Sequence, residues 1–251
     1  MIPEMVSVAI LGGMVAVDRA AGWNLMLSQP IVGACLAGAL VSPGPEWEAW
    51  ALRVPISIGV LLQLLLTDTS LPAAQRQHDT ATAGVVGSTV ALLAMERMHH
   101  QLPVSVGGAL WVLVGVAAGL LAAVAGGVFM GFHRDMSRAD IAKVERVAAA
   151  GNAAGFEFIY WGGVLRIFCI GAVWSWGASL LGLAATLALL PQLGEVLTGR
   201  RVGLFLAVLL GAGIAAAYHA HVAGRRNAIR WVGLGAAATW ILAVVLGRGA
   251  P

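Results

Sequence analysis

Long runs without charge dominate the chain and alternate with short polar segments. A helix that crosses the hydrocarbon of a bilayer needs about 20 mostly apolar residues. At that length the charge-free runs predict an all-α, polytopic helical membrane protein with roughly seven to nine membrane segments. The segments are expected near residues 5–21, 26–42, 51–67, 80–95, 103–132, 158–175, 177–193, 202–222 and 230–247.

Two of the runs are too short for a comfortable crossing and flank a polar insert. Residues 54–67 and 80–95 carry no charge, and between them lies Asp68-Thr-Ser-Leu-Pro-Ala-Ala-Gln-Arg-Gln-His-Asp79. Non-helical backbone is tolerated at membrane depth only where protein buries it or where it lines a wet cavity. The pattern therefore predicts a re-entrant hairpin or a broken helix pair. Such interrupted segments are where transporters tend to place substrate.

Two longer runs leave the helix count open. The run 101–132 exceeds one straight span, which predicts a long tilted helix or a helix with an interfacial extension. The run 158–194 is long enough for two spans and is interrupted only by Arg166. Gly177 and Gly182 are the expected break points between those two spans.

Basic residues indicate part of the orientation. The segments 133–146, 200–201 and 225–230 hold clusters of Arg and Lys, which the positive-inside rule places in the cytoplasm. One straight span would put the last two clusters on opposite faces. Either residues 202–224 dip into the membrane and return, or one cluster breaks the rule. Charge alternates at helical spacing in 133–146, which predicts a solvated amphipathic connector or a docking surface for a cytoplasmic partner.

Composition supports a membrane protein and excludes other classes. Of the 251 residues, 59% are apolar and 11% charged, whereas a soluble domain has about 45–50% and about 25%. Disordered, coiled-coil, collagen-like and disulfide-stapled proteins are excluded on the same grounds. The formal charge of +3 comes without a basic stripe interleaved with aromatics, so nucleic acid is not an expected partner. We treat residues 1–251 as a single membrane-embedded domain.

No cofactor or metal is expected from the sequence. The chain has no G-x-x-x-x-G-K-[ST] phosphate loop. His219 and His221 would point about 200° apart on a helix and could not share an ion there. Cys35 and Cys169 lie in apolar runs without a C-x-x-C pattern, which predicts reduced, buried packing residues.

Arg166 stands inside an apolar segment. An arginine in the hydrocarbon costs roughly 2.5–3.5 kcal/mol on insertion scales, so it should be paired or face water. Asp18, Glu157, Asp68 and Asp79 are the candidate partners. Direct contact with a substrate is the alternative.

The polar insert is the best candidate for a binding site, with an ordinary exposed loop as the alternative. Carboxylates and amides bind the hydroxyl groups of sugars through paired hydrogen bonds. The insert and its edge supply such donors and acceptors in Thr67, Asp68, Thr69, Gln75, Gln77, His78 and Asp79.

The same part of the chain resembles a known family. Four stretches resemble the IIC membrane subunit of mannose/fructose/sorbose-type phosphotransferase-system (PTS) permeases. They are Asp18-Arg19, Met26-Leu-Ser-Gln-Pro-Ile-Val-Gly33, Gly59-Val-Leu-Leu-Gln-Leu-Leu-Leu66 and the insert up to Asp79. The family pattern runs roughly R-P-I-V, G-A-x-L-E-x-x-x-L-G and I-G-A-A-x-P-P-D. Phe158-Ile-Tyr-Trp-Gly-Gly-Val-Leu-Arg166 resembles a later segment in which an arginine also occurs. The resemblance extends over essentially the whole chain.

The resemblance implies a function. Such a subunit forms the sugar translocation path with a IID membrane subunit in the cell inner membrane, as a multi-pass protein. Cytoplasmic IIA and IIB subunits carry phosphohistidines and phosphorylate the sugar, so IIC itself is expected to hold no catalytic residue. Gln63, Asp68 and Asp79 are then expected to contact the sugar, with Arg166 in support and Gln29 as a further candidate.

Departures from the pattern keep alternatives open. The family glutamate is Gln63 here, the following glycine is Asp68, and the G-A-A-x-P-P stretch has become Ala73-Ala-Gln-Arg-Gln-His78. The sugar could therefore differ from mannose. A second hypothesis is a degenerate, non-transporting membrane scaffold or sensor that docks PTS proteins. A third is an unrelated secondary transporter or membrane enzyme. The oligomeric state is left open.

Overall fold

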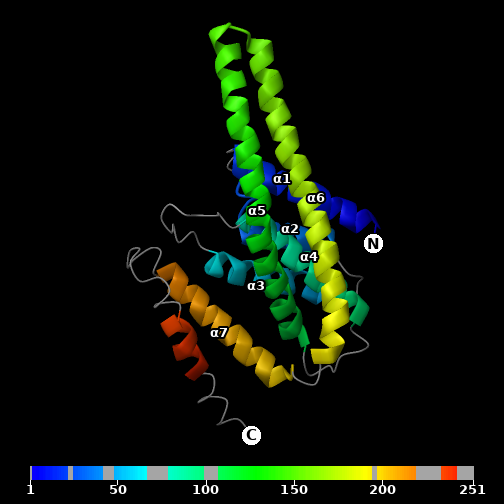
Figure 1. The fold of residues 1–251 in the computed structure, drawn as a ribbon. Helices are drawn as coiled ribbons and strands as arrows, with labels where there is room; N and C mark the ends of the chain where they lie inside the picture. Colours follow the sequence, from blue (N-terminus) through cyan, green and yellow to red (C-terminus); the bar gives the residue numbers. More distant parts are fainter. Residues whose placement is uncertain are drawn as a thin grey trace.

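The computed structural model describes residues 2–21, 25–41, 48–66, 79–98, 107–193, 197–218 and 233–241. Within these residues all regular structure is helical, which confirms the predicted all-α class (Figure 1). The helices are α1 (Ile2–Ala21), α2 (Pro30–Leu40), α3 (Glu48–Leu65), α4 (Thr80–Met98), α5 (Gly107–Ala149), α6 (Ala153–Leu193), α7 (Gly199–Tyr218) and a short helix over 233–241.

Three of the helices in the described part of the chain are long and apolar enough to cross a membrane. They are α5, α6 and α7. Helix α2 and the stretch Trp50–Leu65 of α3 are apolar but shorter. The chain therefore has the composition and helix lengths of a membrane protein, while the full number of crossings stays a prediction.

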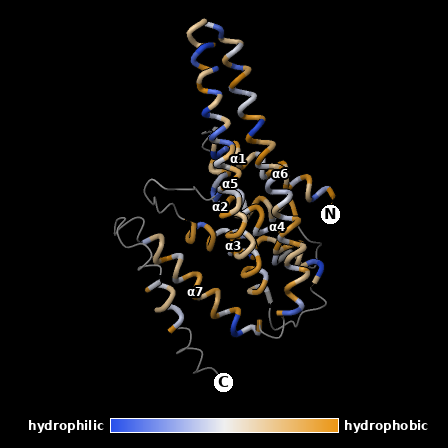
Figure 2. The backbone as a smooth tube through the Cα atoms, viewed as in Figure 1, coloured by the Kyte–Doolittle hydropathy of each residue, from blue (hydrophilic) through white to orange (hydrophobic). Residues whose placement is uncertain are grey.

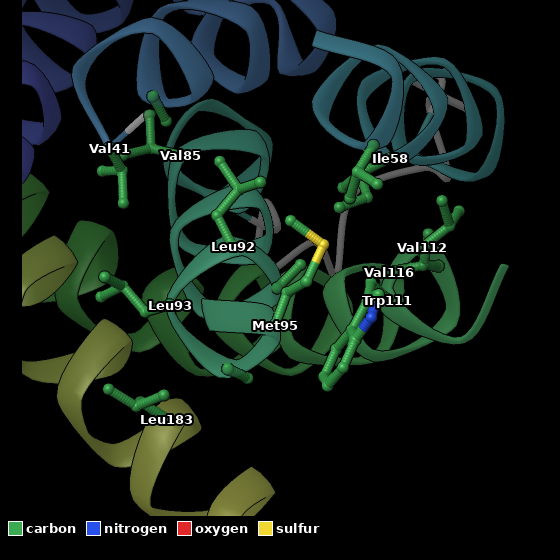
Figure 3. Close-up of a cluster of buried hydrophobic side chains, with 14 of the residues drawn as sticks. Val41, Ile58, Val85, Leu92, Leu93, Met95, Trp111, Val112, Val116 and Leu183 are labelled. Atoms are coloured by element: carbon green, nitrogen blue, oxygen red, sulfur yellow. The ribbon is translucent and has the colours of Figure 1, made fainter. Parts of the chain in front are cut away.

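Helix α4 is the centre of the bundle. It packs against α1, α2, α3, α5 and α6, and nearly all of its side chains from Thr82 to Met95 are buried. Leu92 and Met95 of this helix meet side chains of neighbouring helices, among them Ile58 of α3, in one apolar cluster (Figure 3). The small residues of α4 let these neighbours approach closely.

Small residues also bring other helices together. A Cβ atom added to Gly12 of α1 would collide with Ser175 of α6, and one added to Gly171 of α6 would collide with Ala16 of α1. Only glycine permits this contact between two backbones. Gly115 of α5 likewise lies against Ile58 of α3 and the Gly87 carbonyl of α4, so this glycine also serves helix packing.

Helix α6 corrects a prediction. Residues 158–175 and 177–193, expected as two spans, belong to one unbroken helix. A glycine weakens a helix without removing a backbone donor, whereas proline removes one. Gly182 packs against Val90 of α4, and nothing lies within 4 Å of a Cβ added to Gly177. The 41 residues of α6 span about 60 Å, roughly twice the hydrocarbon thickness.

Helix α5 also continues beyond its apolar run. The segment 133–146, expected as a loop or connector, is helical and is part of α5. The turn after α5 places Gly151 at a φ of 66°, a conformation that favours glycine. Asn152 then accepts a hydrogen bond from the Gly155 N–H (2.9 Å), as an N-cap does. The resulting α5–α6 hairpin projects beyond the other helices (Figure 1), and hydrophilic residues gather on its projecting part (Figure 2).

The unbroken helices bear on orientation. The projecting hairpin and Arg200-Arg201 lie at opposite ends of α6. If α6 crosses the membrane, the two clusters face opposite sides and cannot both be cytoplasmic. Helix α7 is continuous over Gly199–Tyr218, so the chain does not dip and return within those residues. The cluster at 225–230 lies outside the described residues.

Candidate functional site

A first polar cluster joins the end of α1 to the start of α4. Arg19 donates a hydrogen bond from Nη1 to Thr80 Oγ1 (2.8 Å). The same nitrogen lies 3.9 Å from Asp79 Oδ1, and the Asp79 side chain is only 5% exposed. A charged side chain inside an apolar bundle needs such a partner, because the unpaired charge would be costly. The cluster therefore holds a buried carboxylate and a guanidinium at one junction of helices.

Asp79 also begins α4. Its Oδ1 accepts a hydrogen bond from the Thr82 N–H (3.3 Å), and its Oδ2 accepts one from the Thr82 hydroxyl (2.7 Å). This is the geometry of an N-cap, which satisfies a backbone donor that the first helical turn leaves open. The Asp79 N–H donates to the carbonyl of Ala123 in α5 (2.9 Å). Asp79 therefore fixes where α4 starts and how that end rests on α5.

The Trp174 indole approaches the same place on α5 as Asp79. A Cβ added to Gly126 of α5 would lie 2.8 Å from both Asp79 Cβ and Trp174 Nε1. The carboxylate and the indole thus approach the same bare stretch of α5 backbone. The indole nitrogen is buried and has no hydrogen-bond partner within the described residues, and its ring packs against Phe129 with centroids 4.6 Å apart. A buried donor beside a carboxylate suits a hydroxyl group, which both accepts and donates.

Asp18 holds the chain between α1 and α2. Its two carboxylate oxygens accept hydrogen bonds from the backbone N–H groups of Leu25 (2.7 Å) and Ser28 (2.9 Å). The intervening Met26 has a φ of 60°, which is uncommon for a residue with a side chain. Gln29 follows, exposed to solvent, and its side chain does not cap α2. Asp18 therefore has a structural role.

A second polar cluster lies at the foot of the α5–α6 hairpin. Arg166 of α6 donates from Nη2 to Asp140 Oδ2 (2.6 Å), and Lys143 donates from Nζ to Asp140 Oδ1 (2.8 Å). Lys143 and then Arg166 hold the pKa of the Asp140 carboxyl at about 2, below its ordinary range. One turn before Asp140, the Ser137 hydroxyl lies 3.3 Å from His133 Nε2.

The partner of Arg166 corrects the sequence analysis. The arginine is paired, as expected, but none of Asp18, Glu157, Asp68 and Asp79 is the partner that the structure gives it. The carboxylate comes from Asp140, which was predicted to lie in a connector outside the bundle. Because α5 continues as a helix and α6 returns beside it, residues 26 positions apart meet.

The structure places some of the predicted site residues in different surroundings. Asp79 and Arg166 belong to the two separate clusters described above. Gln63 is half-buried on the last turns of α3, and Gln29 is exposed. Asp68, with the insert up to residue 78, lies outside the described residues. Whether the insert forms the tip of a re-entrant hairpin therefore stays a prediction.

Three residues of the clusters were not singled out as site residues from the sequence. Arg19 belongs to one of the stretches that resemble the family, so the sequence did contain a reason to select it. Asp140 stood among other charges that looked solvated. Trp174 lies in an apolar run where nothing distinguishes it from a packing residue.

The two cysteines are free thiols, with Cys35 half-buried and Cys169 exposed. The expectation of burial is wrong for Cys169, because an apolar run in a membrane protein also supplies the surface that faces lipid. Within the described residues no three His, Cys, Asp or Glu side chains gather to hold a metal ion; His219 and His221 lie outside them. No known family, curated protein or solved structure matches the chain.

Proposed function

We propose that the chain is the IIC-type permease subunit of a sugar phosphotransferase system of the mannose/fructose/sorbose class, a multi-pass protein of the cell inner membrane. Its partners would be a IID membrane subunit and cytoplasmic IIA and IIB subunits, which phosphorylate the sugar. The chain would supply the path and the binding groups and no catalytic residue.

The observation that carries the proposal is the buried Asp79 carboxylate beside the Arg19 guanidinium. Ionisable residues inside membrane bundles are rare, and they mark solute pathways more often than surface charges do. Asp79 follows directly on the polar insert, and both Asp79 and Arg19 belong to the stretches that resemble the family. The donor Nε1 of Trp174 adds a group that suits a sugar hydroxyl.

The projecting α5–α6 hairpin supports the same proposal. It extends charged residues beyond the apolar body of the chain (Figure 2), and Arg138 and Asp135 on it are well exposed. A cytoplasmic partner subunit could reach such a surface without entering the membrane.

The test uses Asp79→Asn in cells that express the chain with its genomic neighbours. Asparagine caps a helix as well as aspartate does, so α4 keeps its start while the charge is removed. We expect uptake of mannose, fructose, sorbose or N-acetylgalactosamine, with phosphorylation, and a loss of about tenfold or more in the variant. Asp79→Ala should also abolish uptake, but it removes the N-cap of α4 as well, so its membrane abundance has to be measured beside its uptake.

Glu96→Gln is the matched control, because it removes an exposed carboxylate at the other end of α4, away from the hairpin. Its uptake should equal that of the unmodified chain. Full uptake by Asp79→Asn at equal abundance would contradict the assignment of Asp79 to the sugar site.

A second candidate function is a non-transporting scaffold that docks phosphotransferase proteins. It is favoured by one observation, namely that two predicted sugar-binding residues are already engaged within the chain. Asp79 binds Thr82, and Arg166 binds Asp140. Good expression with no uptake of any sugar, together with capture of IIA or IIB by the hairpin, would favour this function.

A further inference from the structure

A cleft opens at the foot of the α5–α6 hairpin, beside the end of α1. Its volume is about 230 Å³. Polar side chains from both helices of the hairpin line it, namely His133, Ser137, Asp140, Tyr160 and Arg166. Arg166 was expected to support sugar binding, but the carboxylate that carries the proposed sugar site, Asp79, does not line this cleft.

The cleft is flanked by residues of the kinds that are typical of a membrane surface. The apolar run of α5 ends at Phe132, immediately before His133. On α6, Tyr160 and Trp161 pack edge to face, with ring centroids 5.3 Å apart. Tyrosine and tryptophan gather at the boundary between hydrocarbon and water. The charge-free run of α5 therefore ends at the level of the cleft, and two aromatic residues of the kind found at membrane surfaces lie there on α6.

An apolar groove adjoins the cleft between α1 and α6. Its volume is about 470 Å³, and Val164 lines both hollows. Met14, Val17, Trp161, Leu165 and Phe168 form the rest of the groove. A hydrocarbon chain fits a groove lined in this way, because neither the chain nor the groove presents a polar group that would need a hydrogen-bond partner.

Asp140 and Arg166 line the cleft, and Lys143, which lies outside its lining, adds a second cation to this ion-pair cluster. Asp140 is bound by two cations, Lys143 and Arg166, so the three side chains together carry one net positive charge. Arg166 donates a hydrogen bond from Nη2 to Asp140. Its Nε–H is buried and has no hydrogen-bond partner within the described residues. A phosphate oxygen is the acceptor that a guanidinium binds best after a carboxylate.

We infer that the cleft and the groove together bind one anionic phospholipid. Its phosphate lies in the cleft beside the Arg166 guanidinium and the Ser137 hydroxyl, and one acyl chain runs past Val164 into the groove. Basic pockets between membrane helices recognise anionic headgroups in this way. The inference does not depend on sugar transport.

The test measures lipid binding to the purified, delipidated full chain by native mass spectrometry. The probes are phosphatidylglycerol, phosphatidylcholine and inorganic phosphate. We expect phosphatidylglycerol to bind about tenfold more tightly than phosphatidylcholine, and inorganic phosphate to compete only weakly. Equal affinity for the two lipids would overturn the inference. Phosphate that displaces the lipid completely at low concentration would assign the cleft to a free anion and would overturn it as well.

Two variants locate the site. Arg166→Lys keeps a cation for Asp140 but removes Nε, and should reduce the preference for phosphatidylglycerol severalfold. Val164→Trp should block the groove and weaken both lipids. The control Arg138→Lys makes the same change at an exposed ion pair of α5 and should bind lipid normally. If Arg166→Lys and Arg138→Lys behave alike while the helical content of both is unchanged, the inference is wrong.

Discussion

The bundle around α4 and the projecting part of the α5–α6 hairpin place their apolar residues differently. Leu92 of α4 is 1% exposed, whereas Ile141 of the hairpin is 54% exposed. Yet the buried helix α4 contains Thr, Ser and Gly, and its mean hydropathy is too low for a candidate membrane span. Helix α6 is apolar enough for a membrane span, and its side chains are largely exposed. Burial in this chain follows helix packing more closely than it follows hydropathy, because lipid accepts apolar side chains as readily as the protein interior does.

The largest expected difference between the two regions comes from truncating one apolar side chain in each of them. Leu92→Ala should lower the free energy of unfolding by about 2–5 kcal/mol, because the neighbours of α4 cannot fill the cavity. Ile141→Ala should change it by less than about 0.5 kcal/mol. Unfolding of both variants in detergent micelles measures the difference. Equal losses would mean that the hairpin is packed as tightly as the bundle.

A second test compares two glycines on the same helix. Gly126→Ala would force its Cβ to within 2.8 Å of Trp174 Nε1 and Asp79 Cβ, and should cost about 1–3 kcal/mol of unfolding free energy. Gly131→Ala has open space around the new atom and should stabilise α5 by up to about 1 kcal/mol through helix propensity. Thermal unfolding of the pair gives the sign of each effect. A stabilised Gly126→Ala would argue against the close approach of Asp79 and Trp174.

The smallest expected effect is the opening of the hairpin at low pH. The folded chain holds the pKa of Asp140 at about 2, below the ordinary 3.8, so the carboxylate favours the closed hairpin at higher pH. Its contribution is complete above about pH 4 and is lost as the pH falls toward 2. Spin labels at positions 145 and 158 should report a wider hairpin in that range.

Asp140→Asn serves as the control for this acid response. Its label distances should be wider at neutral pH and should not change between pH 4 and 2. A hairpin that opens in the same acid range in Asp140→Asn would assign the response to another group.

The helices themselves could be predicted from the sequence, but their continuity could not. The charge-free run 80–95 corresponds to α4 and 202–222 to α7. The charges after Phe132 resembled the start of a loop. These charged residues instead fit a continuous helix, because Arg138 pairs with Asp135 and Lys143 pairs with Asp140 at i,i+3 spacing along it.

The candidate site was predictable only in part, because its contacts depend on the register of packed helices. Asp79 follows the insert, and its position marked it in the sequence. The pairing of Arg166 with Asp140 requires the turn at Gly151 and two unbroken helices. The approach of Trp174 to Asp79 requires α4, α5 and α6 to meet at Gly126, and no sequence pattern reports that.

The length of α6 has a mechanical consequence. A helix of 41 residues is a rod of about 60 Å, and its close contact with α1 is at Gly171, far from the hairpin end. Tilting the rod by about 10° around that point would move the hairpin tip by roughly 5 Å, since about 30 Å of helix lies beyond it. A small tilt of the packed helices would thereby be amplified at the projecting end of the hairpin.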